Sequence, residues 1–293
     1  MPAGRTPSPL QPLIEKIESI EAVDRPAKAI SNTLSDVPGP GALKDAISGT
    51  QIGHALHPML TDVVIGSFLS ATALDLIGGG DSGTASERLI ALGIAAYPPT
   101  ALTGASDWAD GAVGNDSVRR IGVAHAVTNS AALGLYAASL RARRRGERGK
   151  GTALGLIGAG ALGFAGYLGG HLTLVNGVGV DQTAFDAGPR EWTEATGAAG
   201  LADGEPTRVV VDDTPVLLVK QGESISAIHD RCSHRGCSLT ERGEVSGSEI
   251  ECTCHGSRFS LRDGALLQGP ATQPQPAFET RERDGKLEIR LYS

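Results

Sequence analysis

The sequence contains few cysteines, few aromatic residues and no surplus of positive charge. Its 4 cysteines all lie between Cys232 and Cys254, and 33 acidic residues outnumber 26 lysines and arginines. A disulfide-stapled fold would spread its cysteines along the chain, and a nucleic-acid-binding domain usually carries a basic face. We therefore expect neither a general disulfide framework nor a nucleic-acid partner.

Charge is also missing from one long stretch, and its distribution divides the chain. Residues 152–175 contain no Asp, Glu, Lys or Arg, whereas charged residues become frequent again after Glu191. A chain of 293 residues accommodates about two domains. We predict an N-terminal segment at 1–50, a helical bundle at 51–176, a linker at 177–190 and a β domain at 191–293.

The N-terminal segment has an amphipathic pattern. Apolar residues recur at helical spacing, with charged residues between them, at Leu13, Ile14, Ile17, Ile20 and Val23. The pattern predicts a helix within residues 13–34 that either packs on its own protein or lies on a membrane surface.

Four apolar segments follow, at residues 59–77, 89–102, 121–140 and 152–175. A membrane-spanning helix needs roughly 20 mostly apolar residues, a length that the third and fourth segments reach. The first segment carries Asp62 and Asp75, of which we expect Asp75 to be paired within the bundle. Pro98 and Pro99 break the second segment, where we expect a kink and not a ligand site.

The fourth segment also has the glycine spacing of packed membrane helices. Gly166 and Gly170 stand four residues apart, which lets neighbouring helices approach closely. The composition favours a four-helix membrane bundle over a soluble bundle rich in alanine and glycine.

Basic residues cluster between the third and fourth segments, from Arg141 to Lys150. Lysine and arginine beside helix ends favour the cytoplasmic side of a membrane. With four spans in a cell membrane, this bias places the C-terminal domain on the extracytoplasmic side. Lys44, Arg119 and Arg120 oppose it more weakly.

Short alternating or β-branched runs dominate the sequence after Glu191. Examples are residues 208–211, 216–219, 226–228 and 287–291. Such runs, separated by glycine and aspartate, predict an antiparallel β domain. The predicted fold class is α + β in separate domains, with the four-helix bundle first and the all-β domain second.

Two short motifs carry metal chemistry. The first supplies Cys232 and His234 in a C-x-H pattern, and the second supplies Cys252 and His255 in a C-x-x-H pattern. Two thiolates on one iron and two imidazoles on the other are the ligand set of a Rieske-type [2Fe–2S] cluster. Zinc fingers instead pair cysteine with cysteine and histidine with histidine. The mixed pairing favours the dinuclear cluster.

Across residues 191–293 the chain resembles the Rieske [2Fe–2S] family. Cys237 and Cys254 resemble the extra cysteine pair of its cytochrome bc-type members, which implies a disulfide between the two cluster loops. A disulfide favours an oxidising compartment. The resemblance also implies that the Ser257 hydroxyl bonds a bridging sulfide, and that residues 269–271 begin a proline loop over the cluster.

Two residues depart from the pattern of the high-potential members. Phe259 stands where they have a tyrosine whose hydroxyl bonds a ligating sulfur, and its absence predicts an intermediate reduction potential. Arg235 replaces an apolar residue that faces quinol in those members, which argues against direct quinol oxidation.

Histidines gather at one end of the predicted bundle. The GHxxHP run that contains His54 and His57 resembles the opening of an uncharacterised family of four-helix membrane domains, over about residues 51–180. Because neighbouring helices alternate in direction, His125 and His171 fall at the same end. Imidazoles on facing helices can ligate a b-type haem or another metal, or can simply bond to the backbone or to headgroups.

The sequence thus predicts a membrane-anchored Rieske protein that transfers single electrons, with electron exchange with a haem b in the bundle as a further hypothesis. We expect the partner, a redox protein or a quinone, to dock at the tip formed by His234 and His255. Two alternatives remain open. A soluble ferredoxin-like component of an oxygenase system would be extracted without detergent, and a redox sensor would show no turnover with quinols or cytochromes.

Overall fold

The computed structural model describes residues 9–36, 38–79, 82–197 and 200–292. The chain divides into two compact units. The first, the helical unit, comprises residues 1–36 and 56–178, and the second, the β unit, comprises residues 37–55 and 179–293.

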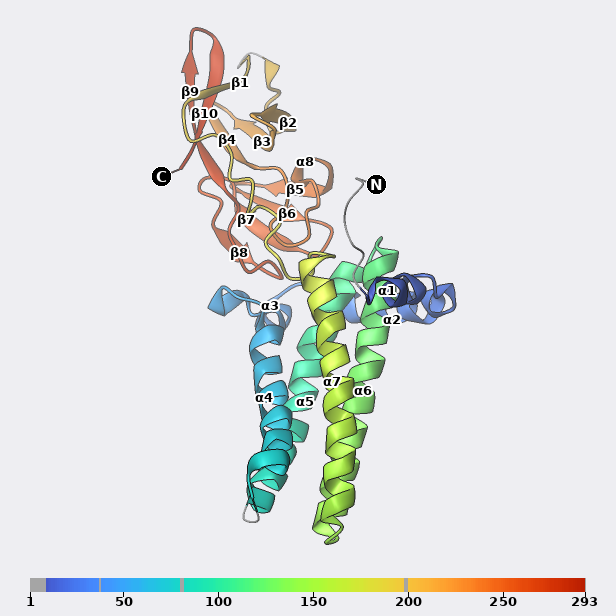
Figure 1. Ribbon diagram of the computed structural model, residues 1–293. Coiled ribbons are helices and arrows are strands. Elements are labelled where there is room, and N and C mark those ends of the chain that lie inside the picture. The colour runs from blue at the N-terminus through green and yellow to red at the C-terminus, as the bar shows by residue number, and fades with distance from the viewer. Residues whose placement is uncertain (1–8, 37, 80–81, 198–199, 293) are drawn as a thin grey trace. The chain divides into compact units, whose positions relative to one another are not determined.

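Four long helices form the body of the helical unit: α4 (Leu56–Ile77), α5 (Gly83–Ala112), α6 (Asp116–Arg144) and α7 (Arg148–Leu174) (Figure 1). Their shared core contains Phe68, Ile90, Tyr136 and Leu162, all buried. The rings of Phe68 and Tyr136 stack with their centroids 4.0 Å apart. Small residues on the facing helices leave room for these few large side chains.

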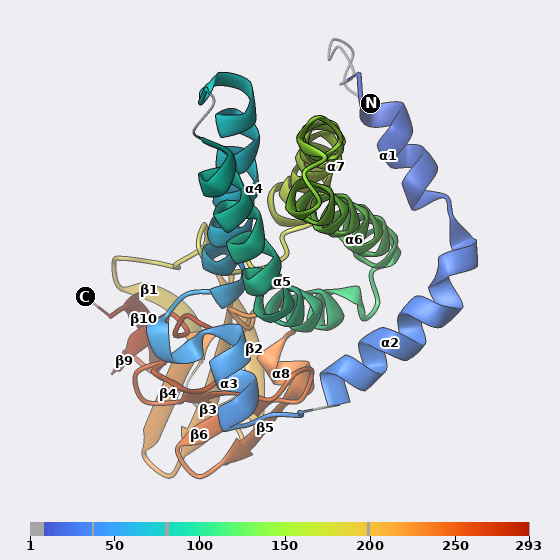
Figure 2. The same ribbon diagram turned by 90° about the horizontal axis from the view of Figure 1, so that it is seen from below.

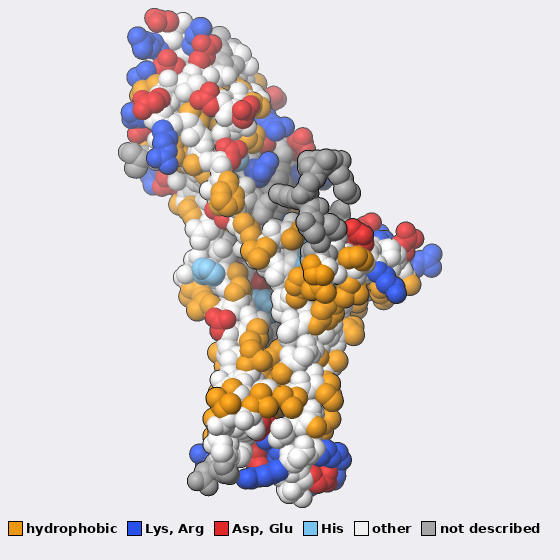
Figure 3. Space-filling view, viewed as in Figure 1, with side chains coloured by type: hydrophobic (Ala, Val, Ile, Leu, Met, Phe, Trp, Pro, Cys, Tyr) orange, Lys and Arg blue, Asp and Glu red, His pale blue; other side chains and the backbone are white. Residues whose placement is uncertain are grey.

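Three of these helices, α4, α5 and α7, are long and apolar enough to cross a membrane. On the visible face, apolar side chains run along the helices and charged ones gather at one end (Figure 3). Helix α5 continues through Pro98 and Pro99, so the prolines do not end the helix, and the expected kink stays a prediction. Segment 121–140 was expected to be of spanning type, but its helix α6 is not among the three found in the described chain. The reason is its polar content, which includes Asn129 and arginines near both ends.

One buried ion pair explains how the first apolar segment accommodates Asp75. Arg143 of α6 donates to both carboxylate oxygens of Asp75 in α4, with Nη1 lying 2.8 Å from Oδ1. Both side chains are almost fully enclosed. Asp75 is therefore paired within the unit, as the sequence suggested.

The N-terminal segment forms two helices, α1 (Gln11–Glu18) and α2 (Asp24–Asp36), separated by the short η1 (Glu21–Val23) (Figure 2). The expectation of one helix within 13–34 is wrong because Pro26 lies in the first turn of α2. There its missing N–H costs nothing, whereas it would break the interior of a longer helix. Ile14 and Ile17 pack with Val118 and Leu168 of the long helices. The apolar face of α1 thus covers its own protein.

The β unit contains two antiparallel sheets. The larger has the order β1-β10-β9-β4-β3-β2. Its strands are β1 (Thr193–Gly197), β2 (Pro206–Val211), β3 (Thr214–Gln221), β4 (Ser224–His229), β9 (Ala277–Arg283) and β10 (Lys286–Leu291). The smaller has the order β5-β6-β7-β8 and comprises β5 (Gly243–Ser246), β6 (Glu249–Cys252), β7 (Ser257–Ser260) and β8 (Leu266–Gln268). The predicted antiparallel β domain is confirmed.

Strand β3 is buried on both faces, so its alternating side chains supply two cores. Leu217 and Val219 point into one core, which also contains Cys232 and Cys252. Val216 and Leu218 point into the other. The first core forms the apolar floor beneath the cysteine-containing loops.

Two further segments belong to the β unit. Residues 38–55, with α3 (Ala42–Ser48) and η2 (Thr50–Ile52), group with it although they precede α4 in the chain. Residues 179–190, for which the sequence predicts a linker, are bonded to the β domain. Gln182 N–H donates to Ser233 at 3.0 Å, and Leu291 N–H donates to Pro189 at 2.7 Å.

Candidate metal centre

The first motif lies in the loop between β4 and the short helix α8 (Leu239–Arg242). Asp230, only 1% exposed, fixes both ends of this loop. Its carboxylate accepts hydrogen bonds from the Thr240 N–H and hydroxyl, each at 2.7 Å, and from the Ser238 hydroxyl at 2.8 Å. Within the loop, Cys232 N–H donates to Cys237 at 2.8 Å. The carboxylate and this backbone bond hold Cys232 and His234 in a short fixed turn.

The second motif lies in the hairpin between β6 and β7. Cys252 ends β6 and stands opposite Ser257 in the register. Gly256, with φ +85°, turns the chain and donates its N–H to the Cys252 carbonyl at 2.8 Å. A left-handed residue is needed at this point, which glycine supplies without strain. The turn brings His255 beside the first loop.

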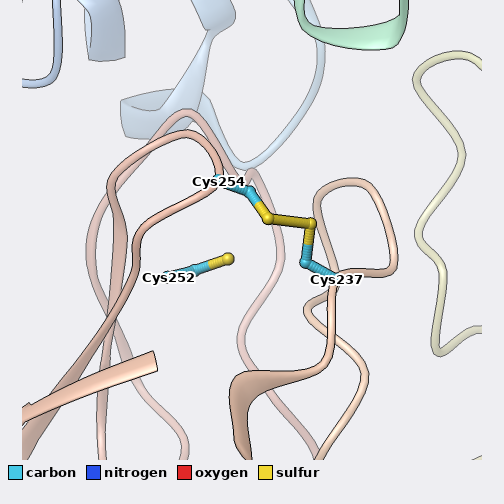
Figure 4. A group of neighbouring side chains, drawn as sticks. All are labelled: Cys237, Cys252 and Cys254. Carbon is cyan, nitrogen blue, oxygen red and sulfur yellow. A yellow bond between two sulfur atoms is a disulfide. The ribbon is translucent and has the colours of Figure 1, made fainter. Parts of the chain in front are cut away.

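A disulfide joins the two loops. Cys237 and Cys254 are bonded, with Sγ atoms 2.13 Å apart, and Cys252 points toward them (Figure 4). The sulfur atoms of these three residues lie within 4.8 Å of one another. Two of the three are disulfide sulfurs and therefore are not available as thiolate ligands. The disulfide implied by the family resemblance is present.

The remaining cysteines and the two motif histidines form a mixed donor set. Cys232 and Cys252 are free thiols, 2% and 1% exposed. The rings of His234 and His255 meet edge to face with centroids 5.0 Å apart. Nδ1 of His234 is buried. Two buried thiols and two imidazoles from opposite loops are the donor chemistry that a [2Fe–2S] cluster of the Rieske type requires.

The shifted pKa values favour metal binding at Cys252 and His234 and oppose it at Cys232. The hydrogen bond between the two thiols raises the pKa of Cys232 and lowers that of Cys252, so one thiolate forms more readily than the other. Burial, followed by the charges of His255, Arg235 and Lys44, holds the pKa of His234 well below its usual value. A neutral imidazole offers a lone pair to a metal, and a protonated one does not.

Ser257 connects the second loop to the segment after β8. Its hydroxyl oxygen accepts a hydrogen bond from the Ala271 N–H at 3.0 Å, which leaves its own hydrogen for another acceptor. Gln268 Nε2 donates to the Gly256 carbonyl at 3.0 Å. Residues 269–273 are therefore fixed to the hairpin that carries His255.

Sequence reasoning missed two residues that position the first loop. Asp230 is one. Gln275, only 2% exposed, is the other: its Oε1 accepts from Ser233 N–H at 2.7 Å, and its Nε2 donates to the carbonyls of His229 and Arg231, each at 2.9 Å. Asp230 lies two residues before Cys232, and this proximity is a weak sequence signal of its role. Gln275 lies 43 positions after Cys232, and no sequence pattern points to it.

A third histidine is buried beneath the first loop. His229 is fully buried and its Nε2 lies 3.3 Å from Asp186 Oδ2. Burial lowers the pKa of His229, and the hydrogen bond and charge of Asp186 offset only part of that shift. Its Nδ1 accepts the Arg231 N–H at 3.0 Å, so the neutral ring also supports the loop.

The four histidines predicted near one end of the bundle separate into a pair and two others. His57 and His125 are close enough to interact electrostatically, and their Nδ1 atoms lie 2.9 Å from the carbonyls of Thr100 and Ala165. His171 Nε2 lies 4.0 Å from Glu18. His54 is exposed and belongs to the β unit.

Comparison with known proteins matches both halves of the chain. Residues 191–279 match the family described as the Rieske [2Fe-2S] domain, and residues 53–182 match a family described as predicted membrane protein (DUF2231). The anthranilate 1,2-dioxygenase ferredoxin subunit of Burkholderia cepacia is 30% identical over 101 residues, which are 34% of this chain and 93% of that protein.

A second relative and a solved structure are also ferredoxins of dioxygenases. The 3-phenylpropionate/cinnamic acid dioxygenase ferredoxin subunit of Escherichia coli (strain K12) is 34% identical over 94 residues, which are 32% of this chain and 87% of that protein. The ferredoxin of carbazole 1,9a-dioxygenase from Nocardioides aromaticivorans IC177 is 30% identical, with a TM-score of 0.32, and matches 34% of this chain and 96% of that one.

Proposed function

Because the chain belongs to the Rieske [2Fe–2S] family, through a domain fused to the C-terminal side of a membrane-protein domain, we propose that it is a membrane-anchored protein that transfers single electrons. The observation that carries the proposal is the pair of buried free thiols, Cys232 and Cys252, enclosed with two imidazoles between disulfide-linked loops.

Each motif would contribute one ligand to each iron in this proposal. Cys232 and Cys252 would hold one iron, and His234 and His255 would hold the other. The bound cluster supplies reversible one-electron chemistry. The chain holds the four donors in place through Asp230, the disulfide and the apolar floor, and the floor keeps water away from the sulfur side.

The partner that fits best is a redox protein docking at the His234 and His255 tip. The similar ferredoxin subunits belong to dioxygenases, which supports a protein partner. Arg235, a long cation immediately after the first-loop ligand His234, disfavours a quinol in the same position. The soluble ferredoxin alternative shares this chemistry but lacks the membrane anchor and has Cys237 and Cys254 reduced.

The anchor is proposed to be multi-pass, with the β unit on the extracytoplasmic side of a cell membrane. Three apolar helices of spanning length and the basic segment Arg141–Lys150 support this arrangement. The disulfide supports the same side, because thiols stay reduced in the cytosol.

The first test is a reduced-minus-oxidised visible spectrum of the detergent-purified full-length protein, with iron and acid-labile sulfide analysis. We expect two irons and two sulfides per chain and a broad Rieske-type absorption. Cys232→Ser and His255→Ala should each abolish the signal, and the exposed substitution Ser246→Ala should leave it intact. Stoichiometric zinc in place of iron would overturn the assignment.

A b-type haem in the bundle is the second part of the proposal, and His57 and His125 are the residues that would hold it. In each ring, a bond from Nδ1–H to a backbone carbonyl leaves Nε2 as the ligand atom, which is the usual arrangement of metal-bound histidine. Gly104 and Gly169 lie against the two rings where any side chain would be crowded. The Asn129 amide, 3.1 Å from His125 Nε2, must turn aside.

The haem assignment predicts which histidines matter. In protein expressed with haem available, a pyridine haemochrome assay should find haem in the wild type, and His57→Ala or His125→Ala should remove it. His54→Ala and His171→Ala are the matched controls and should retain it. A haem-free protein with an intact cluster would contradict the haem assignment and any electron exchange with a haem. The bundle would then be an anchor or a docking module.

A further inference from the structure

The segment formed by residues 38–55 is bonded to the loop that follows β8, more than 200 positions later in the chain. Asp45 Oδ1 accepts the Gly269 N–H at 3.0 Å, and the Thr50 hydroxyl donates to the Ala271 carbonyl at 3.0 Å. Gln273 Nε2 donates to the Gly53 carbonyl at 2.6 Å. Three of the residues 269–273 are therefore held by this one segment, which we term the cap. Its helix α3 lies beside the β domain (Figures 1 and 2).

Two glycines lie close against the cap, one in the loop after β8 and one in the hairpin between β6 and β7. A Cβ on Gly269 would collide with the Thr50 hydroxyl and lie 2.9 Å from Asp45 Oδ1. The φ of Gly269 is not in the left-handed region, so the close approach of the cap, and not backbone strain, accounts for glycine there. Gly256, beside His255, has Pro40 packed against it in the same way. The cap is therefore in tight contact with both the loop after β8 and the hairpin that carries His255.

The cap also carries a charge to the site. Lys44 is only 3% exposed, an unusual state for a lysine, and its charge acts on His234. It immediately precedes Asp45, the residue that bonds Gly269. The side chain that brings the charge and the side chain that fixes the loop are thus placed by the same short helix.

We propose that the cap is an integral part of the cluster site: Asp45 and Thr50 position the loop 269–273, and the Lys44 ammonium raises the reduction potential. This inference rests on the proposed cluster. Reduction adds one negative charge, which a nearby cation stabilises most effectively where water is excluded. Lys44 is a tuning residue in this arrangement, because it is buried in the cap next to Asp45, the residue that bonds Gly269, and it is not a ligand.

The proposal predicts the effect of removing the charge alone. In full-length protein held at the wild-type midpoint potential, Lys44→Met should lower the ratio of reduced to oxidised cluster by about tenfold, equivalent to about 59 mV for one electron. Lys44→Arg should restore most of the ratio. Lys286→Met removes an exposed lysine at the far end of β10 and should change nothing. Equal ratios in Lys44→Met and wild type would overturn the tuning role.

A second measurement does not depend on cluster redox chemistry. Gly269→Ala should push the cap away, so the backbone amides of α3 and η2 should exchange with deuterium at least tenfold faster, while β3 amides keep their wild-type rates. Gly200→Ala is the matched control, because a Cβ there meets open space. Unchanged exchange in Gly269→Ala would overturn the positioning role.

The two failures are distinguishable. A wild-type protein without iron and sulfide would end the proposed function, whatever the exchange rates. If the wild type has its cluster, but Lys44→Met keeps the wild-type potential and Gly269→Ala keeps the wild-type exchange rates, only the proposed role of the cap is overturned.

Discussion

At Ser257 a single hydroxyl connects the loop 269–273 to the predicted cluster position. Because its oxygen accepts the Ala271 N–H, its own hydrogen is directed to another acceptor. Family resemblance indicated the role, and the structure supplies a physical reason for the direction of the bond. The role itself stays a prediction.

Ser257→Ala should lower the reduction potential by about 40 mV. One neutral hydrogen bond contributes about 1 kcal/mol, and 1.4 kcal/mol corresponds to about 59 mV for one electron. Redox titration followed by EPR measures the shift, with Ser246→Ala on the exposed side of β5 as the control. An unchanged potential would mean that the hydroxyl hydrogen does not reach the cluster.

Phe259 is fully buried in the apolar floor, where it has no hydroxyl to offer to a sulfur. We therefore expect an intermediate reduction potential for the wild-type protein. A reductive titration that gives a potential as high as those of quinol-oxidising Rieske proteins would contradict this expectation.

His229 should make the stability of the β unit depend on pH. Burial lowers its pKa, so below about pH 6.5, the ordinary value for histidine, the unfolded chain binds a proton that the folded chain resists. Stability is fully present above that pH and falls as the pH drops toward the folded-state pKa. Asp186 and Asp230 oppose the shift, and Arg231 adds to it.

Pulse proteolysis in urea at pH 7.5 and pH 5.5 measures this effect. The wild type should lose more stability between the two conditions than His229→Gln does. His54→Gln, at an exposed histidine of the same unit, is the control and should behave as the wild type. Equal losses in wild type and His229→Gln would assign the pH dependence to other groups.

At the scale of elements, the disulfide joins two loops whose ends the sheets already fix. Cys237 and Cys254 are 17 positions apart, and closing a loop of that length in the unfolded chain corresponds to about 3 kcal/mol. The double variant Cys237→Ser/Cys254→Ser should lose about that much stability in urea titrations. Addition of a thiol reductant to the wild type should produce the same loss. A loss below about 0.5 kcal/mol would show that the loops are held without the bond.

Strand positions could be predicted from sequence because alternation is a local signal. The runs at 208–211, 216–219 and 226–228 all lie within observed strands. Helix boundaries were harder to predict from sequence than strand positions. Pro26 starts a new helix, whereas α5 passes through Pro98 and Pro99.

The cap could not be predicted, because the contacts that define it join residues 220 to 224 positions apart. Its local pattern is that of a short helix before a bundle. The ligand motifs, in contrast, are compact, so Cys232, His234, Cys252 and His255 could be identified without knowing the fold. The supporting residues Asp230 and Gln275 act through hydrogen bonds that no local pattern encodes.

At the scale of the whole molecule, an ion pair and a polar helix must be reconciled with a membrane. Asp75 and Arg143 form an ion pair, and α6, the most polar of the four long helices, packs Ala132, Tyr136 and Leu140 into the core it shares with the other three. Polar groups that face the interior of a bundle avoid the cost of contact with lipid. Four spans are therefore compatible with only three helices that pass on length and hydropathy.

The membrane anchor predicts how the full-length protein fractionates. It should remain with membranes washed in alkaline carbonate and be released only by detergent, because apolar helices of 22 to 30 residues match the thickness of a bilayer. A peripheral membrane protein treated in parallel should appear in the wash. Release of this protein by carbonate would favour the soluble ferredoxin alternative, in which α4 to α7 form a water-soluble bundle. Retention, together with an intact disulfide in freshly lysed cells treated with a thiol-blocking reagent, would favour a membrane protein whose β unit faces an oxidising compartment.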